Sequence, residues 1–233
     1  MPGRRTILVT LAIQIVCASL FVRLGFWQLS RLSERRAFNS KVVERLRETP
    51  QPLATLSPDT SLGHYRQLSV SGTFDFDREV FLAGRSHNGS PGVNLLTPLR
   101  TGAGDSAVLV NRGWVYSADA ASLDDASRWR EPSGASISGY AETYVGADSR
   151  PQGGAGRRVR SLDRAAIERA VGLPLAAYIL VQTSGATLRP DSVPVRLKLP
   201  VLDDGPHKNY ALQWFAFAII TVVGGVALML RSR

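Results

Sequence analysis

Cysteine is almost absent from this sequence: the 233 residues include one, Cys17. No disulfide can form within a single chain, and zinc or copper sites that need several thiolate ligands are excluded. Cys17 lies inside a long apolar segment. We therefore interpret it as a small buried hydrophobic side chain.

Residues of the kinds that catalyse reactions are also scarce. The only histidines are His64, His87 and His207, and no G-x-S-x-G elbow, dinucleotide-binding fingerprint or P-loop is present. The Gly-rich basic tract at residues 150–160 lacks the P-loop lysine pattern, which indicates a loop. We expect no enzymatic activity and no metal site. An extracytoplasmic hydrolase stays as an alternative, because catalytic residues need not be close in sequence.

The charge is unbalanced, with 28 Lys and Arg against 19 Asp and Glu, a formal net charge of +9. Such an excess favours nucleic acid, anionic lipid or an acidic protein partner. The arginines are scattered and no nucleic-acid motif is visible. Membrane lipid and a protein partner are therefore the expected contacts.

Two long apolar segments are present, one near each end of the chain. Residues 7–29 and 210–230 are each long enough to cross a bilayer, which needs roughly 20 mostly apolar residues. The first segment is too long for a typical cleaved signal peptide, so we predict an uncleaved anchor. In the second, Gly224 and Gly225 are small enough to let a neighbouring helix approach or, alternatively, face lipid.

The two predicted spans place both termini on one side of the membrane. Arg4 and Arg5 precede the first span, and Arg231 and Arg233 follow the second. This placement favours residues 1–6 and 231–233 in the cytoplasm. The loop after the first span is basic too, but long domains translocate largely regardless of charge. We therefore predict an extracytoplasmic domain at residues 30–209. Since six residues precede the first span, a bacterial plasma membrane is the expected location.

The domain begins with a charged helix that Pro50 and Pro52 end. Short apolar stretches then alternate with Gly, Pro, Asn and Asp, which predicts strands at residues 64–74, 78–86, 94–101, 106–116, 135–144 and 175–183. One short helix is expected at residues 163–171, between Asp163 and Gly172. The predicted fold is a membrane-anchored α+β protein with a mainly antiparallel β domain, barrel-like or sandwich-like.

His207 stands three residues before the second predicted span. A neutral imidazole at a membrane face can ligate a haem iron or another metal. Alternatively, His207 caps or anchors the helix at the interface. The residues alone leave both interpretations open.

Five short stretches together resemble the surfeit-locus protein one family, the Shy-type cytochrome c oxidase assembly factors. They are residues 25–31 (GFWQLSR), 65–72 (YRQLSVSG), 97–99 (TPL), 108–115 (VLVNRGWV) and 207–215 (HKNYALQWF). Within them, the candidate partner-contact or structural residues are Trp27, Gln28, Arg31, Tyr65, Arg66, Arg112, Gly113, Trp114, Tyr210, Gln213 and Trp214.

The resemblance implies two spans, a mainly β outer domain and a role in maturing subunit I of cytochrome c oxidase. It also implies a link to haem a, with His207 as the ligand. Arg31 and Arg112 are then candidates for the haem propionates or a partner, unless they form structural pairs or contact head groups. The alternative function is a structural accessory subunit that stays bound to the oxidase and holds no cofactor.

The glutamines beside Trp27 and Trp214 suggest a contact between the spans. Gln28 ends the first apolar segment and Gln213 lies near the start of the second. We predict that the two spans pack there and bond through the side-chain amides of Gln28 and Gln213.

Overall fold

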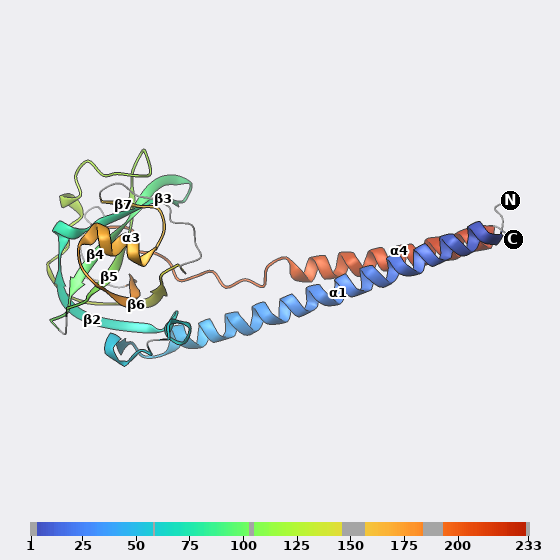
Figure 1. Cartoon of the computed structure of the whole chain (residues 1–233), viewed down its shortest axis with the longest axis horizontal. Coiled ribbons are helices and arrows are strands. Elements are labelled where there is room, and N and C mark those ends of the chain that lie inside the picture. The colour runs from blue at the N-terminus through green and yellow to red at the C-terminus, as the bar shows by residue number, and fades with distance from the viewer. Residues whose placement is uncertain (1–3, 58, 103–104, 146–156, 184–192, 232–233) are drawn as a thin grey trace. The chain divides into compact units, whose positions relative to one another are not determined.

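The computed structural model describes residues 4–57, 59–102, 105–145, 157–183 and 193–231. Contacts divide the described chain into two units. The first unit, drawn from residues 1–41 and 201–233, is a pair of long helices, and the second, from residues 42–200, is a β domain (Figure 1).

The helix pair consists of α1 (Arg4–Arg47) and α4 (His207–Arg231). Within the described residues, these two helices are long and apolar enough to cross a membrane. They run antiparallel and side by side, so the start of α1 and the end of α4 lie at the same end of the pair (Figure 1). The 44 residues of α1 rise about 66 Å, more than twice the bilayer core of about 30 Å.

Small residues at intervals of seven form the buried seam of α4: Ala211, Ala218 and Gly225. This spacing returns to one helix face and lets another helix approach closely. A Cβ atom at Gly225 would lie 2.4 Å from Oε1 of Gln14 on α1, whereas a Cβ at Gly224 would meet nothing within 4 Å. Gly225 therefore has the predicted helix-contact role, and Gly224 lies on an open face.

The predicted charged helix is confirmed as the continuation of α1, which ends at Arg47, three residues before Pro50. Short helices follow in the domain: η1 (Leu53–Thr55), α2 (Thr60–Gly63), η2 (Phe76–Arg78), η3 (Ser127–Trp129) and α3 (Arg164–Val171). The prediction of α3 is confirmed with its caps: the Asp163 carboxylate accepts from the Ala166 N–H at 3.0 Å, and Gly172 adopts φ 67°.

Eight strands in the described residues form one sheet in the order β1-β2-β6-β8-β5-β4-β3-β7. They are β1 (Gln51–Pro52), β2 (Gln67–Phe74), β3 (Val80–His87), β4 (Ser90–Arg100), β5 (Ala107–Tyr116), β6 (Gly134–Thr143), β7 (Arg158–Val159) and β8 (Leu175–Gln182). The six predicted strands are confirmed, while the two-residue strands β1 and β7 are too short to leave a periodic pattern in the sequence.

The sheet is mixed, and our prediction of a mainly antiparallel barrel or sandwich is wrong. The pairs β1–β2, β5–β8 and β3–β7 are parallel, one inside the sheet and one at each edge. A parallel pair needs a long connection, and the chain forms β6, β7 and α3 between β5 and β8. The end of β2 also pairs with β4 over two residues, which curls the sheet, and β3 and β7 continue beyond β4 without closing a barrel.

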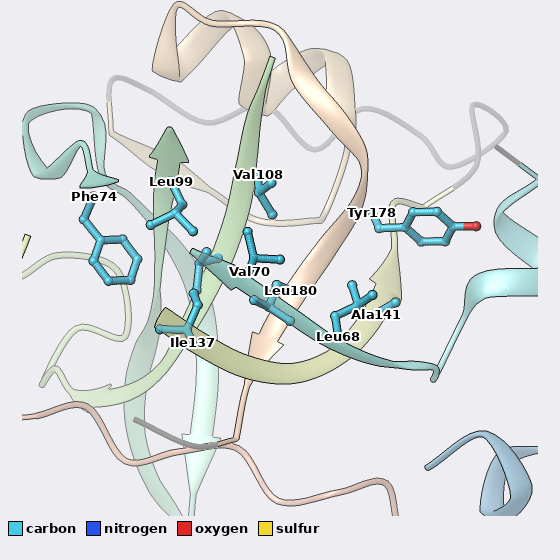
Figure 2. Packing of buried hydrophobic residues seen from close by; sticks show 10 residues of the cluster. Leu68, Val70, Phe74, Leu99, Val108, Ile137, Ala141, Tyr178 and Leu180 are labelled. Carbon is cyan, nitrogen blue, oxygen red and sulfur yellow. The ribbon is translucent and has the colours of Figure 1, made fainter. Parts of the chain in front are cut away.

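The core lies on the inner side of this curl. Figure 2 shows one of its clusters, to which β2, β4, β5, β6 and β8 all contribute buried apolar side chains. Tyr178 at its edge donates from its hydroxyl to the carbonyls of Ser57 (2.6 Å) and Asp59 (2.9 Å), which satisfies the polar end of a buried ring. Of the Gly-rich loop predicted at residues 150–160, residues 150–156 lie outside the described part of the chain. Its last residues include the short strand β7.

Candidate functional site

The candidate site is the start of α4, where the chain turns into the second apolar helix. Gly205 adopts φ 66°, a left-handed conformation that side chains other than glycine rarely take. Its N–H donates to the Asp203 carboxylate at 3.1 Å, and the Tyr210 N–H donates to the Pro206 carbonyl at 3.1 Å. These bonds shape a tight turn that makes His207 the first residue of α4.

Three side chains of α1 hold this turn. Asn39 Nδ2 donates to the Asp203 carbonyl at 2.8 Å, and Arg35 Nε donates to the same oxygen at 3.2 Å. Arg36 donates from Nε (2.9 Å) and Nη2 (2.7 Å) to one carboxylate oxygen of Asp204, and this hydrogen bond is the main cause that lowers the pKa of Asp204. The position of His207 is therefore set by the charged part of α1.

His207 is bonded directly to Gln28. Its Nδ1 lies 2.9 Å from the side-chain oxygen Oε1 of Gln28. An amide oxygen can only accept a hydrogen bond, so this contact fits the imidazole tautomer with its proton on Nδ1 and its lone pair on Nε2. Nε2 has no hydrogen-bond partner among the described residues. A Cβ at Gly205 would lie 3.7 Å from this atom, so glycine keeps that side of the ring open.

Aromatic rings pack between the helices just inside the apolar segments. Phe21 stacks on Trp214 with ring centroids 5.8 Å apart, and Phe26 meets Phe215 edge-on at 5.4 Å. A Cβ at Gly25 would lie 2.5 Å from the Phe215 ring, so this contact depends on glycine. The His207–Gln28 pair thus lies at the end of an aromatic layer.

The other candidate residues of the helix pair are exposed: Trp27, Arg31, Tyr210 and Gln213. Arg31 pairs with Glu34 on its own helix at 2.6 Å. The predicted amide contact between Gln28 and Gln213 is wrong, because Gln28 contacts His207 and Gln213 lies on an exposed face of α4. The position of each glutamine along its apolar segment indicates a similar depth for both. It does not indicate which face of the helix each one occupies.

Tyr65 and Arg66 lie directly before β2, which begins at Gln67, and contact other parts of the domain. Tyr65 adopts φ 66° and stacks on His64 with ring centroids 3.7 Å apart. Arg66 pairs with Glu48 and donates from Nε to the Leu62 carbonyl at 3.1 Å. Both residues tie the segment between α1 and β2 to the sheet.

Arg112 is fully buried, with no exposed side-chain surface. It donates to Glu79 at 2.7 Å and to Glu131 at 3.1 Å, and Glu131 also pairs with Arg196. Of the alternatives for Arg112, this geometry matches the structural pair. A haem propionate or an oxidase surface cannot reach this guanidinium in the folded domain.

Gly113 and Trp114 hold the segment around residue 195 against β5. Gly113 adopts φ 125°, and a Cβ there would lie 2.4 Å from the Val195 carbonyl oxygen. Trp114 exchanges both backbone hydrogen bonds with Val195 at 2.8 Å. The N-R-G-W motif therefore builds the domain interior.

Sequence reasoning missed the partners of these residues. The signal for the turn is charge complementarity: the basic pair Arg35 and Arg36 follows the first apolar segment, and the acidic pair Asp203 and Asp204 precedes the second. No comparable signal marks Glu79 or Glu131, whose pairing with Arg112 arises from strand order. Among the described residues, no group of three or more His, Cys, Asp or Glu side chains is placed to hold a metal ion.

Comparison with known sequences assigns the family. The sequence model of the SURF1 family matches residues 15–219, which is most of the chain. The chain belongs to the SURF1 family. This confirms the family that the five short stretches resemble, and the match includes the β domain and part of each long helix.

Two bacterial SURF1-like relatives are similar over nearly their whole length, and a yeast relative is similar over a shorter stretch. A SURF1-like protein of Rickettsia bellii is 27% identical over 229 residues, 96% of this chain and 89% of the relative. A SURF1-like protein of Rickettsia felis is 25% identical over 90% of this chain and 92% of the relative. The cytochrome oxidase assembly protein SHY1 of Saccharomyces cerevisiae is 34% identical over 95 residues, 40% of this chain and 24% of that protein.

Proposed function

We propose that this SURF1-family protein acts in cytochrome c oxidase assembly by holding haem a at His207 for transfer to subunit I. Its similarity to SHY1, whose name states oxidase assembly, supports the general role. The observation that carries the haem site is the hydrogen bond between His207 Nδ1 and Gln28 Oε1.

This hydrogen bond prepares the imidazole as a ligand. Iron is bound by the lone pair of a neutral imidazole nitrogen, and a hydrogen bond from the other ring nitrogen fixes the tautomer and the ring orientation. Gln28 provides this second bond from the facing helix. Because the turn at residues 203–206 is held by Arg35, Arg36 and Asn39, the ring is positioned before any ligand arrives.

The surroundings suit an amphipathic cargo. The haem macrocycle is apolar and its propionates are anionic, so it fits where apolar helices meet a basic segment. Phe21, Phe26 and Trp214 lie on the apolar side of His207, within two turns of the helices. On the basic side, Arg31 remains a candidate for a propionate, since its pair with Glu34 is exposed to solvent and such pairs contribute little free energy.

We further propose that α1 and α4 both cross a bacterial plasma membrane, with the β domain outside and both termini in the cytoplasm. Their antiparallel pairing and the exposed apolar side chains along both helices support two crossings. Protease added to spheroplasts is expected to digest the β domain, while sealed inverted vesicles protect it. Digestion only in the inverted vesicles would reverse the orientation.

The first experiment is a visible absorption spectrum of the full chain, purified in mild detergent from cells that make haem a. We expect the wild type to carry haem a and His207→Ala to lose it. His87→Ala is the matched control, because His87 lies in the β domain against the Trp114 ring and should leave haem binding unchanged. Haem retained by His207→Ala would remove the ligand role.

Gln28 variants test the positioning of the ring. Gln28→Leu removes the acceptor and is expected to weaken haem affinity about 10–100-fold, the usual cost of losing a partner that orients a ligand. Gln28→Glu keeps an acceptor in the same place and should retain affinity. Equal affinities for both variants would show that the hydrogen bond does not orient the ligand.

A tagged pull-down from solubilised membranes tests the partner. Oxidase subunit I recovered with haem a still bound to the separated protein supports transfer. Intact oxidase at fixed stoichiometry, with no haem on this chain, indicates the alternative of a bound accessory subunit. Absence of any oxidase subunit would contradict the assembly role itself.

A further inference from the structure

A hollow on the β domain is lined by three arginines that neither the fold nor the haem proposal uses. It has a volume of about 380 Å³, near the small end of the range of ligand pockets. Its lining side chains come from β3, from the segment after β5 and from β7 with the residue that follows it. The lining residues are Ala83, Gly84, Arg85, Asp119, Ala120, Ala121, Arg158 and Arg160.

Backbone contacts shape this hollow. The register of β3 against β4 shifts between Leu82 and Arg85, and Gly84 adopts φ 70° there. The Gly84 N–H donates to the Ala120 carbonyl at 2.7 Å, which holds the segment after β5 against the irregular strand. On the other side, β7 pairs with β3 through Phe81 and Arg158. The arginines are thus carried by paired backbone.

The three arginines form no ion pair within the part of the chain that the structure describes. One hydrogen bond links two of them, from Arg85 Nη2 to the Arg160 carbonyl at 3.3 Å. The Nε atoms of Arg85 and Arg158 are buried and have no hydrogen-bond partner. Burial without a counter-charge lowers the pKa of Arg85. Buried donors without a hydrogen-bond partner are costly to the fold.

The one acid in the hollow does not neutralise the arginines. Asp119 accepts hydrogen bonds from the Ser117 hydroxyl (2.6 Å), from the N–H groups of Ala121 and Ser122, and from the Ser122 hydroxyl (2.7 Å). These bonds, with that of Ser117 the largest cause, lower the pKa of Asp119. Both of its oxygens accept hydrogen bonds within this turn, so among the described lining residues three arginines accompany one carboxylate that is already hydrogen-bonded.

We propose that this hollow binds a phosphate group, with Arg85 and Arg158 as its principal donors and Arg160 beside them. Guanidinium groups match the oxygens of phosphate in planar two-point contacts. Guanidinium groups that line a hollow from two strands need more acceptor oxygens than one carboxylate offers, and a tetrahedral oxyanion supplies them. The phosphate belongs either to a free anion or to a lipid head group, and the site is independent of the haem proposal.

The test is isothermal titration calorimetry on the full chain in non-ionic detergent, at constant ionic strength set with chloride. Inorganic phosphate is the first probe and dihexanoyl phosphatidic acid, a short-chain phospholipid, is the second. We expect saturable binding by wild type of at least one probe. Binding of inorganic phosphate identifies a free anion as sufficient, and binding of the phospholipid alone identifies a lipid head group.

Two pairs of variants locate the site. Arg158→Gln should weaken binding at least tenfold, while Arg128→Gln removes the same charge from an exposed position outside the hollow and should bind as wild type does. Ala121→Glu places a carboxylate in the hollow and should also weaken binding at least tenfold. Ala121→Gln has the same size without the charge, and we expect less than a threefold change.

The Ala121 pair decides the question if Arg158→Gln does not fold, as judged by circular dichroism. Binding of neither probe by wild type would overturn the proposal. Equal affinity in Ala121→Glu and Ala121→Gln would overturn it too, because it would place any bound phosphate elsewhere.

Discussion

In the β domain Arg112 lies fully buried between Glu79 and Glu131, whereas in the helix pair the apolar side chains of Leu20 and Ile219 are 52% and 63% exposed. The domain encloses this cation and its two acids in protein, and the helix pair leaves apolar side chains exposed. Each arrangement is stable only in a matching solvent. The domain has the interior of a protein that folds in water, and the helix pair has the surface of one that folds in lipid.

The two regions also place their polar contacts differently. In the domain, polar groups form a closed network, in which Glu131 joins Arg112 to Arg196. In the helix pair, the contacts that link the helices through polar groups gather at one end, at Gln28, His207 and the turn before α4. A polar network therefore stabilises the domain, while in the helix pair it positions a single ring.

The largest effect is expected from breaking the buried network. Arg112→Ala leaves Glu79 buried without its cation and should reduce the free energy of unfolding by about 3–5 kcal/mol. Arg100→Ala is the control, because Arg100 forms an exposed pair with Asp75 and its loss should cost about 0–1 kcal/mol. Chemical denaturation of the full chain in detergent measures both. Equal losses would mean that burial does not set the strength of the pair.

The second largest loss of stability is expected from backbone strain in the domain. Gly113→Ala forces a side chain into φ 125° and against the Val195 carbonyl, and we expect a loss of at least about 2 kcal/mol. Gly134→Ala adds the same methyl group in open space at the start of β6, and its effect should stay within about 0.5 kcal/mol. The same denaturation experiment applies. A neutral Gly113→Ala would show that the segment around residue 195 moves freely away from β5.

The helix pair offers a parallel comparison of glycines. Gly25→Ala pushes the Phe215 ring, which can shift at some cost in packing, so we expect a loss of about 1–2 kcal/mol. Gly224→Ala meets nothing and should raise stability slightly through helix propensity. Thermal unfolding of the full chain in detergent, followed by circular dichroism, distinguishes them. Matching melting temperatures would mean that the helices do not pack closely at Gly25.

The smallest expected effect is a change in how the stability of the domain depends on acidic pH. Burial raises the pKa of Glu131, but hydrogen bonding and charge from Arg196 and then Arg112 lower it more, so its pKa in the folded chain lies below the ordinary value of 4.5. Stability from this group is present above pH 4.5 and is lost as the pH falls through the lower folded value. Stability of Glu131→Gln should therefore fall less steeply on acidification than that of wild type.

The control for this titration is Glu44→Gln, which removes an exposed carboxylate from α1 and should follow the wild-type pH dependence. Denaturant midpoints measured across the acidic range give the comparison. If the denaturant midpoints of Glu131→Gln and wild type fell equally with decreasing pH, Glu131 would not contribute to the acid sensitivity of the domain.

Much of the secondary structure could be predicted because it depends on local signals. The charge-free segments, Pro50, and the caps Asp163 and Gly172 marked the helices, and alternation marked six strands. The parallel pairing of β5 with β8 could not be predicted, since strand order depends on contacts between distant segments. Of the site, the sequence indicated His207 and Gln28 separately, but the helix faces that bring them together are set by packing.

By itself, the sequence determined the two apolar helices, the six longer strands and the family, because length, periodicity and motif order are properties of the chain. Only the tertiary structure decided which side chains meet. It paired Gln28 with His207 and not with Gln213, placed Arg112 between two acids, and left Arg85 and Arg158 without an ion pair among the residues that the structure describes. The physical reason is that hydrogen bonds and ion pairs act over a few ångströms, a distance that only packing can set between distant residues.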